Sequence, residues 1–441
     1  MYFFIKSYGC QMNLYDSQKI EDLLLSAGHL RAETPDQANL LIFNTCSIRE
    51  KADDKLFSDL GRANLLKQQY SGEDFKIVVA GCVSQSRPQD IIARHPYVDI
   101  ILGPQDIQNI AQKLTEKRDN PEVATSLKSA DKFDVFNAID FLAPRDVSAL
   151  LTIQEGCDNF CTYCVVPHTR GREFSRTVAE ILKEAKMMIS CGVKEITLLG
   201  QNVNSYHGQY SDGRSCTLAE LLYEMANLDG LQRLRYVTSN PKDVDEEIAK
   251  AHRDIPILMP FLHLPVQSGS NEILRKMNRR YSREKYLEVI SMLREYRPDM
   301  AFSSDFIVGF PNETDQDFED TLDLVKQVGY AQAYSFKYSP RPNTPAATMK
   351  NQIPEDVKSA RLQVLQDLLN FQQDTFNTNS VGKKMKVLFT KPGKHEGQFV
   401  GRSEYFQAVS VNSDKIGIGD IAEVMITEAV SHSLKGKLDE C

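Results

Sequence analysis

The stretch Cys157-Asp-Asn-Phe-Cys161-Thr-Tyr-Cys164 places three thiols within eight residues, and the next cysteine along the chain is Cys191. A tetrahedral zinc site or a fully ligated iron–sulfur cluster usually takes four protein ligands. Three ligands on one short loop therefore predict a cubane cluster in which the protein holds three irons and leaves the fourth open. An open iron can bind a small molecule through that molecule's own donor atoms. The alternative interpretation is a zinc knuckle or a set of buried thiols.

The spacing of these thiols, cysteine-x3-cysteine-x2-cysteine with the aromatic residue Tyr163 before the last, resembles the radical S-adenosylmethionine (SAM) signature. The match is specific, because three cysteines and an aromatic residue must coincide. The ring of Tyr163 could lie near the cluster or the adenine of SAM, or could simply fill the core. Tyr163 is therefore a candidate SAM contact.

The composition is that of an ordinary globular protein. The chain has 441 residues, of which 41% are hydrophobic and 25% charged, enough for about two to four domains. No apolar run reaches the roughly 18 residues that a membrane span requires, and the first residues are too short an apolar stretch for a signal peptide. We therefore expect a cytoplasmic protein with no membrane partner. The net charge of −8 argues against indiscriminate nucleic-acid binding but allows a local basic patch.

The first third of the chain alternates apolar runs with helical patterns, which predicts an α/β domain over 1–118 with a parallel sheet covered on both faces. The expected strands are 2–8, 40–45, 76–80 and 98–102, and the expected helices are 16–27, 49–69, 88–94 and 105–117. The polar, aperiodic stretch 119–142 is expected to be a linker.

Three cysteines follow three of these expected strands: Cys10, Cys46 and Cys82. Open α/β sheets bind ligands at the carboxyl ends of their strands, so these thiols, distant in sequence, are expected to meet in space. Gly9 and Gly81 would let the backbone approach a bulky cluster closely. The pattern predicts a second three-cysteine cluster, and the alternative is three independent core cysteines.

The region 143–375 repeats strand and helix six times, which predicts a partial (β/α)6 barrel. The expected strands are 150–154, 195–199, 233–238, 261–266, 301–308 and 333–338. The cysteine loop follows the first strand, at the mouth where barrel enzymes keep their chemistry. Polar side chains at the ends of the other strands are candidates to bind SAM by hydrogen bonds: Gln201, Asn202, Ser239, Gln267 and Asp305.

The last region, 378–441, shows broken alternation that predicts a small antiparallel β-barrel. One stretch of it forms a basic edge: Lys383, Lys384, Lys386 and Arg402. Together with Phe399, Tyr405 and Phe406, this edge would suit RNA, because cations hold phosphates and aromatic rings stack on bases. A solvated lysine face is the alternative.

Further stretches extend the resemblance almost end to end: Tyr8-Gly-Cys-Gln-Met-Asn13, Phe43-Asn-Thr-Cys-Ser-Ile-Arg-Glu50, Gly156 to Arg172, Leu198 to Tyr206, His263 to Ser270 and Asp305 to Pro311. The chain resembles the methylthiotransferase family of radical SAM enzymes, including its C-terminal RNA-binding TRAM module. Gln11-Met-Asn13 and Ser47-Ile-Arg-Glu50 look like the branch that acts on isopentenyladenosine. His168 and Asn312 depart from the usual pattern in loops.

The resemblance implies two [4Fe-4S] clusters. Cys157, Cys161 and Cys164 would hold the one that cleaves SAM to methionine and a 5′-deoxyadenosyl radical, which removes hydrogen from C2 of N6-isopentenyladenosine 37 in the anticodon loop of tRNA. Cys10, Cys46 and Cys82 would hold an auxiliary cluster, at which a second SAM methylates the sulfur to be transferred. A one-electron reductant and a sulfur donor, both of unknown identity, are implied as partners.

Two alternatives remain open. The same chemistry could act on threonylcarbamoyladenosine 37 of tRNA or on a ribosomal protein. A reading from another class is a non-catalytic iron–sulfur protein that binds RNA or transfers electrons.

Overall fold

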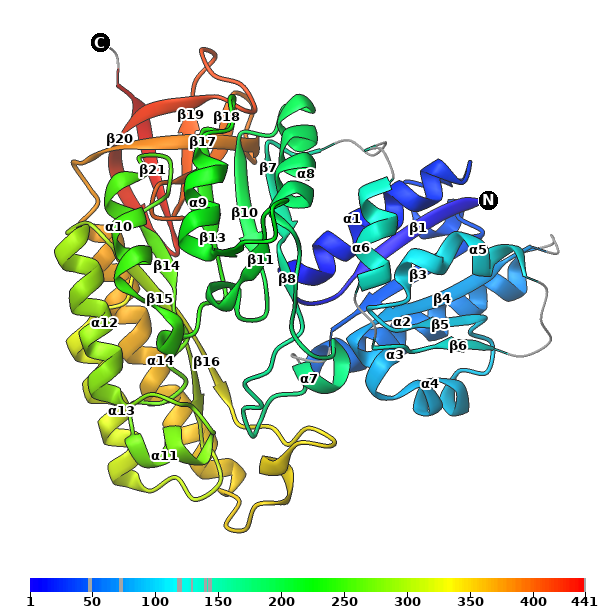
Figure 1. Cartoon of the computed structure of the whole chain (residues 1–441), viewed down its shortest axis with the longest axis horizontal. Coiled ribbons are helices and arrows are strands. Elements are labelled where there is room, and N and C mark those ends of the chain that lie inside the picture. The colour runs from blue at the N-terminus through cyan, green and yellow to red at the C-terminus, as the bar shows by residue number, and fades with distance from the viewer. Residues whose placement is uncertain are drawn as a thin grey trace.

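A computed structural model describes residues 1–46, 50–70, 74–116, 121–127, 130–138, 141 and 145–439. The central domain carries the other two: the N-terminal α/β domain lies beside it, and the C-terminal β-barrel covers one of its ends (Figure 1). No helix in the described ranges is long and apolar enough to cross a membrane.

The N-terminal domain is a parallel sheet with strand order β2-β1-β3-β4-β5-β6. Its strands are β1 (Tyr2–Ser7), β2 (Leu30–Arg31), β3 (Leu40–Thr45), β4 (Lys76–Gly81), β5 (Ile100–Leu102) and β6 (Glu122–Ala124). Its helices are α1 (Gln11–Ser26), α2 (Glu50–Gln69), α3 (Cys82–Ser86), α4 (Pro88–Arg94) and α5 (Ile110–Thr115), with short 3-10 turns η1 (Pro35–Gln37) and η2 (Ile107–Asn109). Because side chains alternate along a strand, one buried cluster contains Ile42 and Val78 and a second contains Leu41 and Ile77. Both faces of the sheet are thus covered, as the sequence predicts.

The stretch expected to be a linker contains two structured elements. β6 pairs with β5 as the last strand of the sheet, and α6 (Ala130–Ala138) buries Phe133 and Phe136 in the same core as α1. Phe133 also stacks on Phe174 of the central domain. The segment around these two phenylalanines is largely polar, and tertiary packing stabilises the helix that the local sequence does not predict.

The central domain contains all six predicted strands, in two three-stranded parallel sheets ordered β7-β10-β13 and β14-β15-β16. The strands are β7 (Ser148–Thr152), β10 (Glu195–Leu199), β13 (Arg233–Tyr236), β14 (Phe261–His263), β15 (Ala301–Val308) and β16 (Gln332–Lys337). A single hydrophobic core spans both sheets. The expected partial barrel is therefore present, open between β7 and β16.

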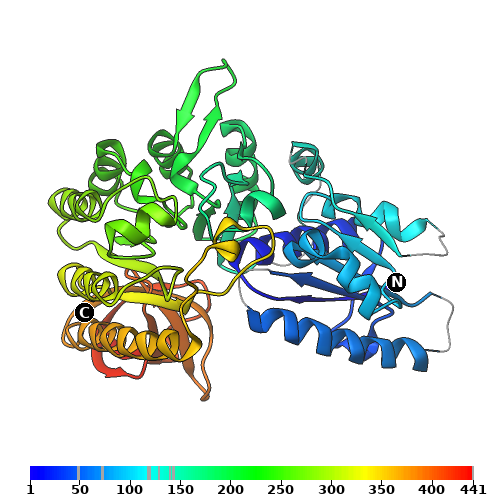
Figure 2. The same ribbon diagram turned by 90° about the horizontal axis from the view of Figure 1, so that it is seen from below.

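Helices pack on the outside of this partial barrel, and most begin at a side-chain cap. They are α8 (Val178–Ser190), α9 (Leu218–Ala226), α10 (Glu246–Asp254), α11 (Asn271–Lys276), α12 (Arg283–Tyr296), α13 (Asp315–Val328) and α14 (Glu355–Thr378), with 3-10 turns η3 (Val203–Ser205), η4 (Pro241–Asp243) and η5 (Pro345–Thr348). Thr177, Thr217 and Thr314 form capping boxes that fix the starts of α8, α9 and α13. The domain also has α7 (Val166–Thr169) and the pair β8 (Gln154–Glu155) and β9 (Phe174–Ser175). The hairpin of β11 (His207–Gln209) and β12 (Ser215–Thr217) projects from the body (Figure 2).

The C-terminal domain is a closed barrel with strand order β17-β18-β19-β21-β20. Its strands are β17 (Lys384–Pro392), β18 (Gln398–Ser403), β19 (Ala408–Asn412), β20 (Ile421–Val430) and β21 (Ser433–Leu438). Arg233 donates to the carbonyls of Lys386 at 2.7 Å and Arg402 at 2.8 Å, and Arg235 donates to those of Ser403 and Glu404, both at 3.0 Å.

Arg233 is the first residue of β13, so the C-terminal barrel docks on the amino ends of the central strands. It therefore covers the end of the partial barrel opposite the cysteine loop (Figure 1).

A stripe of buried polar side chains on α1 joins the N-terminal domain to the rest of the chain. Asp16, Lys19 and Asp22 recur every third residue, so they share one face of the helix, and each is at most 1% exposed. Asp16 pairs with Lys132 and Arg170, Lys19 pairs with Glu184, and Asp22 pairs with Arg145.

Glu184 on α8, the partner of Lys19 in this stripe, has a strongly shifted pKa. Burial alone would raise the pKa of Glu184, but the charges of Lys19 and Arg176 outweigh it and hold the pKa at about 2. Its contribution to stability is therefore fully present above the usual glutamate pKa of about 4.5 and is lost as pH falls towards 2.

We expect Glu184→Gln to lower the free energy of unfolding of the apoprotein at pH 7 by about 3–5 kcal/mol, because it leaves Lys19 and Arg176 buried with less countercharge. The difference from wild type should shrink as pH falls from about 4.5 towards 2. Urea unfolding across this pH range measures it. Glu247→Gln is the control, since its pair with Lys250 is on the surface and should change stability by less than about 1 kcal/mol. If the difference in unfolding free energy between Glu184→Gln and wild type did not change with pH, the ionised Glu184 would not be its cause.

Candidate active site between two cysteine triads

The N-terminal triad lies at the carboxyl ends of three neighbouring strands. Cys10 caps the start of α1 after β1, Cys46 directly follows β3, and Cys82 begins α3 after β4. β3 pairs with both β1 and β4, so the three strand ends are adjacent in the sheet. The three cysteines thus follow the ends of three neighbouring strands, and their role as cluster ligands stays a prediction.

The thiols of this triad interact with one another. A hydrogen bond with Cys46 is the main reason that the pKa of Cys10 falls to about 6, and the charge of Arg170 contributes, while burial acts in the opposite direction. Burial raises the pKa of Cys82, which also feels the charges of Arg170 and Cys10. A thiolate is the form that ligates metal, and the lowered pKa of Cys10 favours that form.

Two glycines make this arrangement possible, for a different reason from the one expected. A Cβ on Gly9 would lie 2.1 Å from the Cβ and 2.6 Å from the Sγ of Cys46, and one on Gly81 would lie 2.4 Å from the carbonyl oxygen of Thr45. Both have positive φ, +114° and +98°. The glycines therefore make room for the loop that carries Cys46, at the place where a side chain would displace its thiol.

Asn13 and Asn44 lock the strand ends to one another. Asn13 donates to the side chain of Asn44 at 3.0 Å and to the carbonyl of Thr45 at 2.8 Å, and Asn44 donates to the carbonyl of Asn13 at 2.8 Å. The side-chain oxygen of Asn13 accepts from the thiol of Cys10 at 3.0 Å. The stretch Ser47-Ile-Arg, which carried part of the branch assignment, lies outside the described residues.

The second triad sits on the loop after β8, at the mouth of the partial barrel. The backbone NH of Cys164 donates to the carbonyl of Cys161 at 3.0 Å, and the side chain of Asn159 donates to the thiol of Cys157 at 3.4 Å. Burial raises the pKa of Cys157, and raises that of Cys164 to about 12. These thiols therefore need a nearby positive charge to ionise, and a bound metal would supply it.

Segments from the far side of the barrel clamp this loop. Asn278 donates to the carbonyls of Asn159 at 3.2 Å and Phe160 at 3.0 Å. The partly buried guanidinium of Arg279 lies 3.5 Å from the thiol of Cys161 and donates to the hydroxyl of Tyr281 at 2.8 Å. Arg279 was not foreseen from the sequence, because its contact with Cys161 joins residues 118 positions apart.

Three of the predicted SAM contacts have buried polar atoms without a hydrogen-bond partner among the described residues. They are Nε2 of Gln201, Oδ1 of Asn202 and Oγ of Ser239. The other atom of the Gln201 amide accepts from the backbone NH of Gly156 at 2.5 Å, beside the cysteine loop. Buried polar atoms left unpaired are costly, so their presence at this mouth is what a site for a polar ligand provides.

The other predicted SAM contacts are engaged within the protein. Asp305 lies 3.4 Å from the Nε2 of His263. Gln267 has a φ of +75° and bridges to β15 through its backbone. Tyr163 packs against a small apolar cluster that includes Phe310 and Tyr338, as in the alternative in which its ring fills the core.

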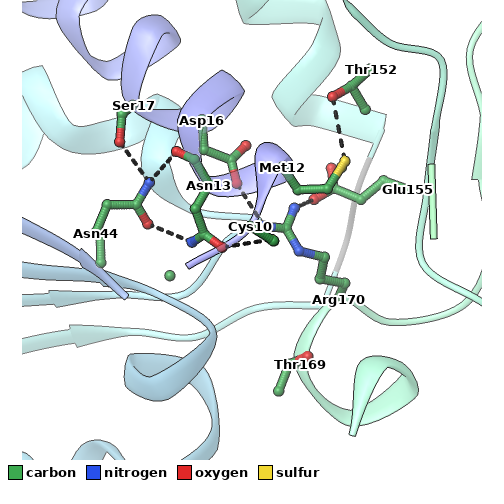
Figure 3. Close-up of polar contacts among 12 residues, drawn as sticks. Cys10, Met12, Asn13, Asp16, Ser17, Asn44, Thr152, Glu155, Thr169 and Arg170 are labelled. Atoms are coloured by element: carbon green, nitrogen blue, oxygen red, sulfur yellow. Dashed lines mark hydrogen bonds and ion pairs between the residues drawn. The ribbon is translucent and has the colours of Figure 1, made fainter. Parts of the chain in front are cut away.

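Arg170 lies beside Cys10 and α1, as Figure 3 shows. It donates to Asp16 of α1 at 2.8 Å and forms an ion pair with Glu155. Lys132 of α6 completes the group, 2.8 Å from Asp16 and 3.0 Å from Glu155. All four side chains are at most 3% exposed. The sequence gives no local signal for this network, because its members come from four separate elements.

The predicted basic edge of the C-terminal barrel is largely occupied. Lys384 forms ion pairs with Asp439 and Glu423, and the backbones of Lys386 and Arg402 bind Arg233. The Arg402 guanidinium lies over Phe406. Of the four residues, Lys383 is an exposed lysine outside these contacts.

The three aromatic side chains of that edge make contacts within the protein. Phe406 stacks on Phe261 with ring centroids 5.7 Å apart, and Tyr405 donates to Asp299 at 3.0 Å. Phe399 packs against the core of the barrel. These contacts leave the three side chains partly buried, so their stacking on a base stays a prediction.

No group of three or more His, Cys, Asp or Glu side chains stands at metal-binding distances within the described part of the chain. The donor sets nevertheless fit iron–sulfur clusters: each triad offers three neighbouring thiols. The glycines beside Cys46 let its loop approach the other two strand ends, and the unpaired polar atoms beside the second triad leave partners for a ligand.

Comparisons with known proteins cover the whole chain. The family model "Radical SAM superfamily" matches residues 151–325, "Uncharacterized protein family UPF0004" matches 2–103, and "TRAM domain" matches 379–438. The radical SAM methyltransferase TsrM from Kitasatospora setae, solved with cobalamin and a [4Fe-4S] cluster, has a TM-score of 0.57 at 14% identity, covering 79% of this chain and 77% of that one. That likeness concerns the fold.

Fold, cysteine loop and family model together define a radical SAM enzyme, which uses SAM. Two curated relatives are named tRNA-2-methylthio-N(6)-dimethylallyladenosine synthase. The one from Bartonella tribocorum is 51% identical and covers 99% of this chain and 96% of its own length. The one from Bartonella bacilliformis is also 51% identical, with 98% and 95% covered. The chain belongs to this family of tRNA methylthiotransferases.

Gly9→Ala is expected to displace Cys46 and so to remove the auxiliary cluster while leaving the other triad intact. Iron and sulfide per chain after anaerobic reconstitution should fall by roughly half, since one of two four-iron clusters is lost. Gly28→Ala is the matched control, because Gly28 also has positive φ, +81°, but a Cβ there meets no atom within 4 Å. Equal iron loss in both variants would mean that backbone strain, rather than the contact with Cys46, is responsible.

Proposed function

We propose that this enzyme adds a methylthio group to C2 of N6-isopentenyladenosine at position 37 of tRNA, using two molecules of SAM per turnover. Membership of the synthase family carries the proposal. It is supported by two cysteine triads held on either side of one domain interface. As a tRNA-modifying enzyme it would act in the cytoplasm, with a one-electron reductant and a sulfur donor from outside the chain.

In this proposal Cys157, Cys161 and Cys164 hold the cluster that binds SAM, and Cys10, Cys46 and Cys82 hold the auxiliary cluster. The two clusters and SAM, when bound, supply the electron, the radical and the sulfur for a C–H bond that acid–base groups could not open. The protein residues hold these groups in place and exclude water.

Gln201, Asn202 and Ser239 would bind the polar groups of SAM with the atoms that lack partners. Gln201 also holds Gly156, so it would place the SAM ligand relative to the cysteine loop. Arg279 would stabilise negative charge at Cys161. Gln267 and Asp305 lie on the same rim and remain candidates.

A face on the open side of the partial barrel would receive the base. In the pairing of β15 with β16, Asp305 lies opposite Tyr334 and Ile307 lies opposite Phe336. These four side chains therefore lie on the same face of the sheet. Phe302 and Phe306, which lie on the other face of the sheet, pack in the core with the helices. Tyr334 and Phe336 therefore face the inside of the barrel, and they are 45% and 42% exposed.

The docked C-terminal barrel adjoins this face, because the charge of Arg402 interacts with Tyr334. Lys383 and the other basic residues at that end would hold tRNA phosphates. The distance from the C-terminal barrel to the loop of the second triad is about the length of one strand, roughly 25 Å for the eight residues of β15. An anticodon arm is long enough to span that distance.

The function is tested by mass spectrometry of tRNA nucleosides from a deletion strain carrying wild-type or variant genes. Wild type should restore 2-methylthio-N6-isopentenyladenosine, and Cys161→Ala and Cys46→Ala should not. In vitro, Cys161→Ala should lose deoxyadenosine formation, whereas Cys46→Ala should retain it. An unchanged nucleoside profile in the deletion strain rejects the proposal. A missing mark on threonylcarbamoyladenosine, or on a ribosomal protein, would assign the alternative substrates, and absence of SAM consumption by the reduced enzyme would indicate a non-catalytic protein.

Tyr334→Ala should weaken tRNA binding by roughly fivefold to 150-fold, as expected for the loss of a base stack of about 1–3 kcal/mol. SAM cleavage in the absence of tRNA should be unchanged. Phe371→Ala is the control, since Phe371 is 69% exposed on α14, away from this face. Equal tRNA affinity for wild type and Tyr334→Ala, measured by filter binding, would exclude this face from the tRNA site.

A further inference from the structure

Two consecutive residues connect the triads through the backbone. The carbonyl of Arg170 accepts from the side chain of Gln105 in the N-terminal domain at 3.1 Å. The carbonyl of Gly171 accepts from the backbone NH of Cys157 at 3.3 Å. The loop of the second triad is thus fixed to the domain that carries the first triad by hydrogen bonds one residue apart.

The side chain of Arg170 is held at a fixed point beside the first triad. Its two carboxylate partners, Asp16 and Glu155, approach from α1 and β8, and Lys132 shares both of them. The group contains two cations and two anions, so a buried charge is paired on every side. Such a network keeps its geometry, because any movement would leave an ion unpaired in the interior.

The guanidinium acts on the thiols of the first triad. In Figure 3 it points towards Cys10, on the side of the interface opposite the sheet. Its charge acts on Cys10 and Cys82, and its side chain makes a hydrogen bond with Cys82. Arg170 therefore touches the donor set of the first triad while its backbone belongs to the loop of the second.

We propose that Arg170 is a positioning residue for the auxiliary cluster: its guanidinium stabilises negative charge on Cys10 and Cys82, and its backbone fixes that cluster relative to the radical SAM loop. This inference rests on the assignment of the auxiliary triad in the proposed function. A fixed cation stabilises the reduced, more negative state of a cluster more than the oxidised state, so it raises the reduction potential.

The test uses the full chain with Cys157→Ala, Cys161→Ala and Cys164→Ala, so that iron bound to the protein reports the auxiliary site alone. The midpoint potential is measured by redox titration followed by electron paramagnetic resonance. Arg170→Met should shift it to more negative values, and Arg170→Lys should restore most of the shift. Asp16→Asn, which removes a neighbouring anion, should move it in the opposite direction.

Arg145→Met is the matched control. Arg145 is another buried arginine that pairs with α1, through Asp22, two turns further along the helix. It should leave the potential unchanged while perturbing the same domain interface. Loss of the cluster from Arg170→Met, with retention in Arg170→Lys and Arg145→Met, would also support the role of the charge.

An unchanged potential in folded Arg170→Met, or shifts in the same direction for Arg170→Met and Asp16→Asn, would overturn the inference. Both results leave the proposed function standing, since the cluster is present. Failure of the background protein itself to hold iron would reject the auxiliary site, and the role of Arg170 with it.

Discussion

The structure depends on the burial of charged side chains along one face of α1. Asp16, Lys19 and Asp22 each meet an opposite charge from outside the N-terminal sheet, and each pair is removed from water. Taking ions from water is costly, so such pairs add little net stability compared with apolar contacts, but they tolerate few alternative arrangements. They therefore fix one orientation of the N-terminal domain, and of its cysteine triad, relative to the central domain.

Each triad uses its own local means to hold three thiols. In the N-terminal domain, Gly9 makes room for Cys46, and Asn13 and Asn44 tie the strand ends together. In the central domain, Asn278 and Arg279 hold the cysteine loop from the far side of the barrel. The C-terminal barrel closes the opposite end of that partial barrel, whose two sheets do not pair between β7 and β16.

Helices and strands with a strong hydrophobic period could be predicted from the sequence. The features that were missed, such as α6, depend on packing between distant segments. All six strands of the partial barrel and the β3 strand of the first sheet lie where the apolar runs placed them. α6 was missed because its two phenylalanines gain their partners from α1 and Phe174, which are distant in sequence. Phe406 was assigned to RNA because an exposed ring and an interface ring look alike in sequence, and Phe261, its partner, is 145 residues away.

By itself, the sequence determined the two cysteine triads, the order of the three domains and the polar residues at the strand ends, because local spacing and strand–helix alternation carry that information. The tertiary structure alone decided that Arg170 stands between the triads, that Arg279 reaches Cys161, and that the C-terminal barrel docks away from the mouth. These arrangements depend on ion pairs and hydrogen bonds between segments more than a hundred residues apart, whose partners are fixed only when the domains pack.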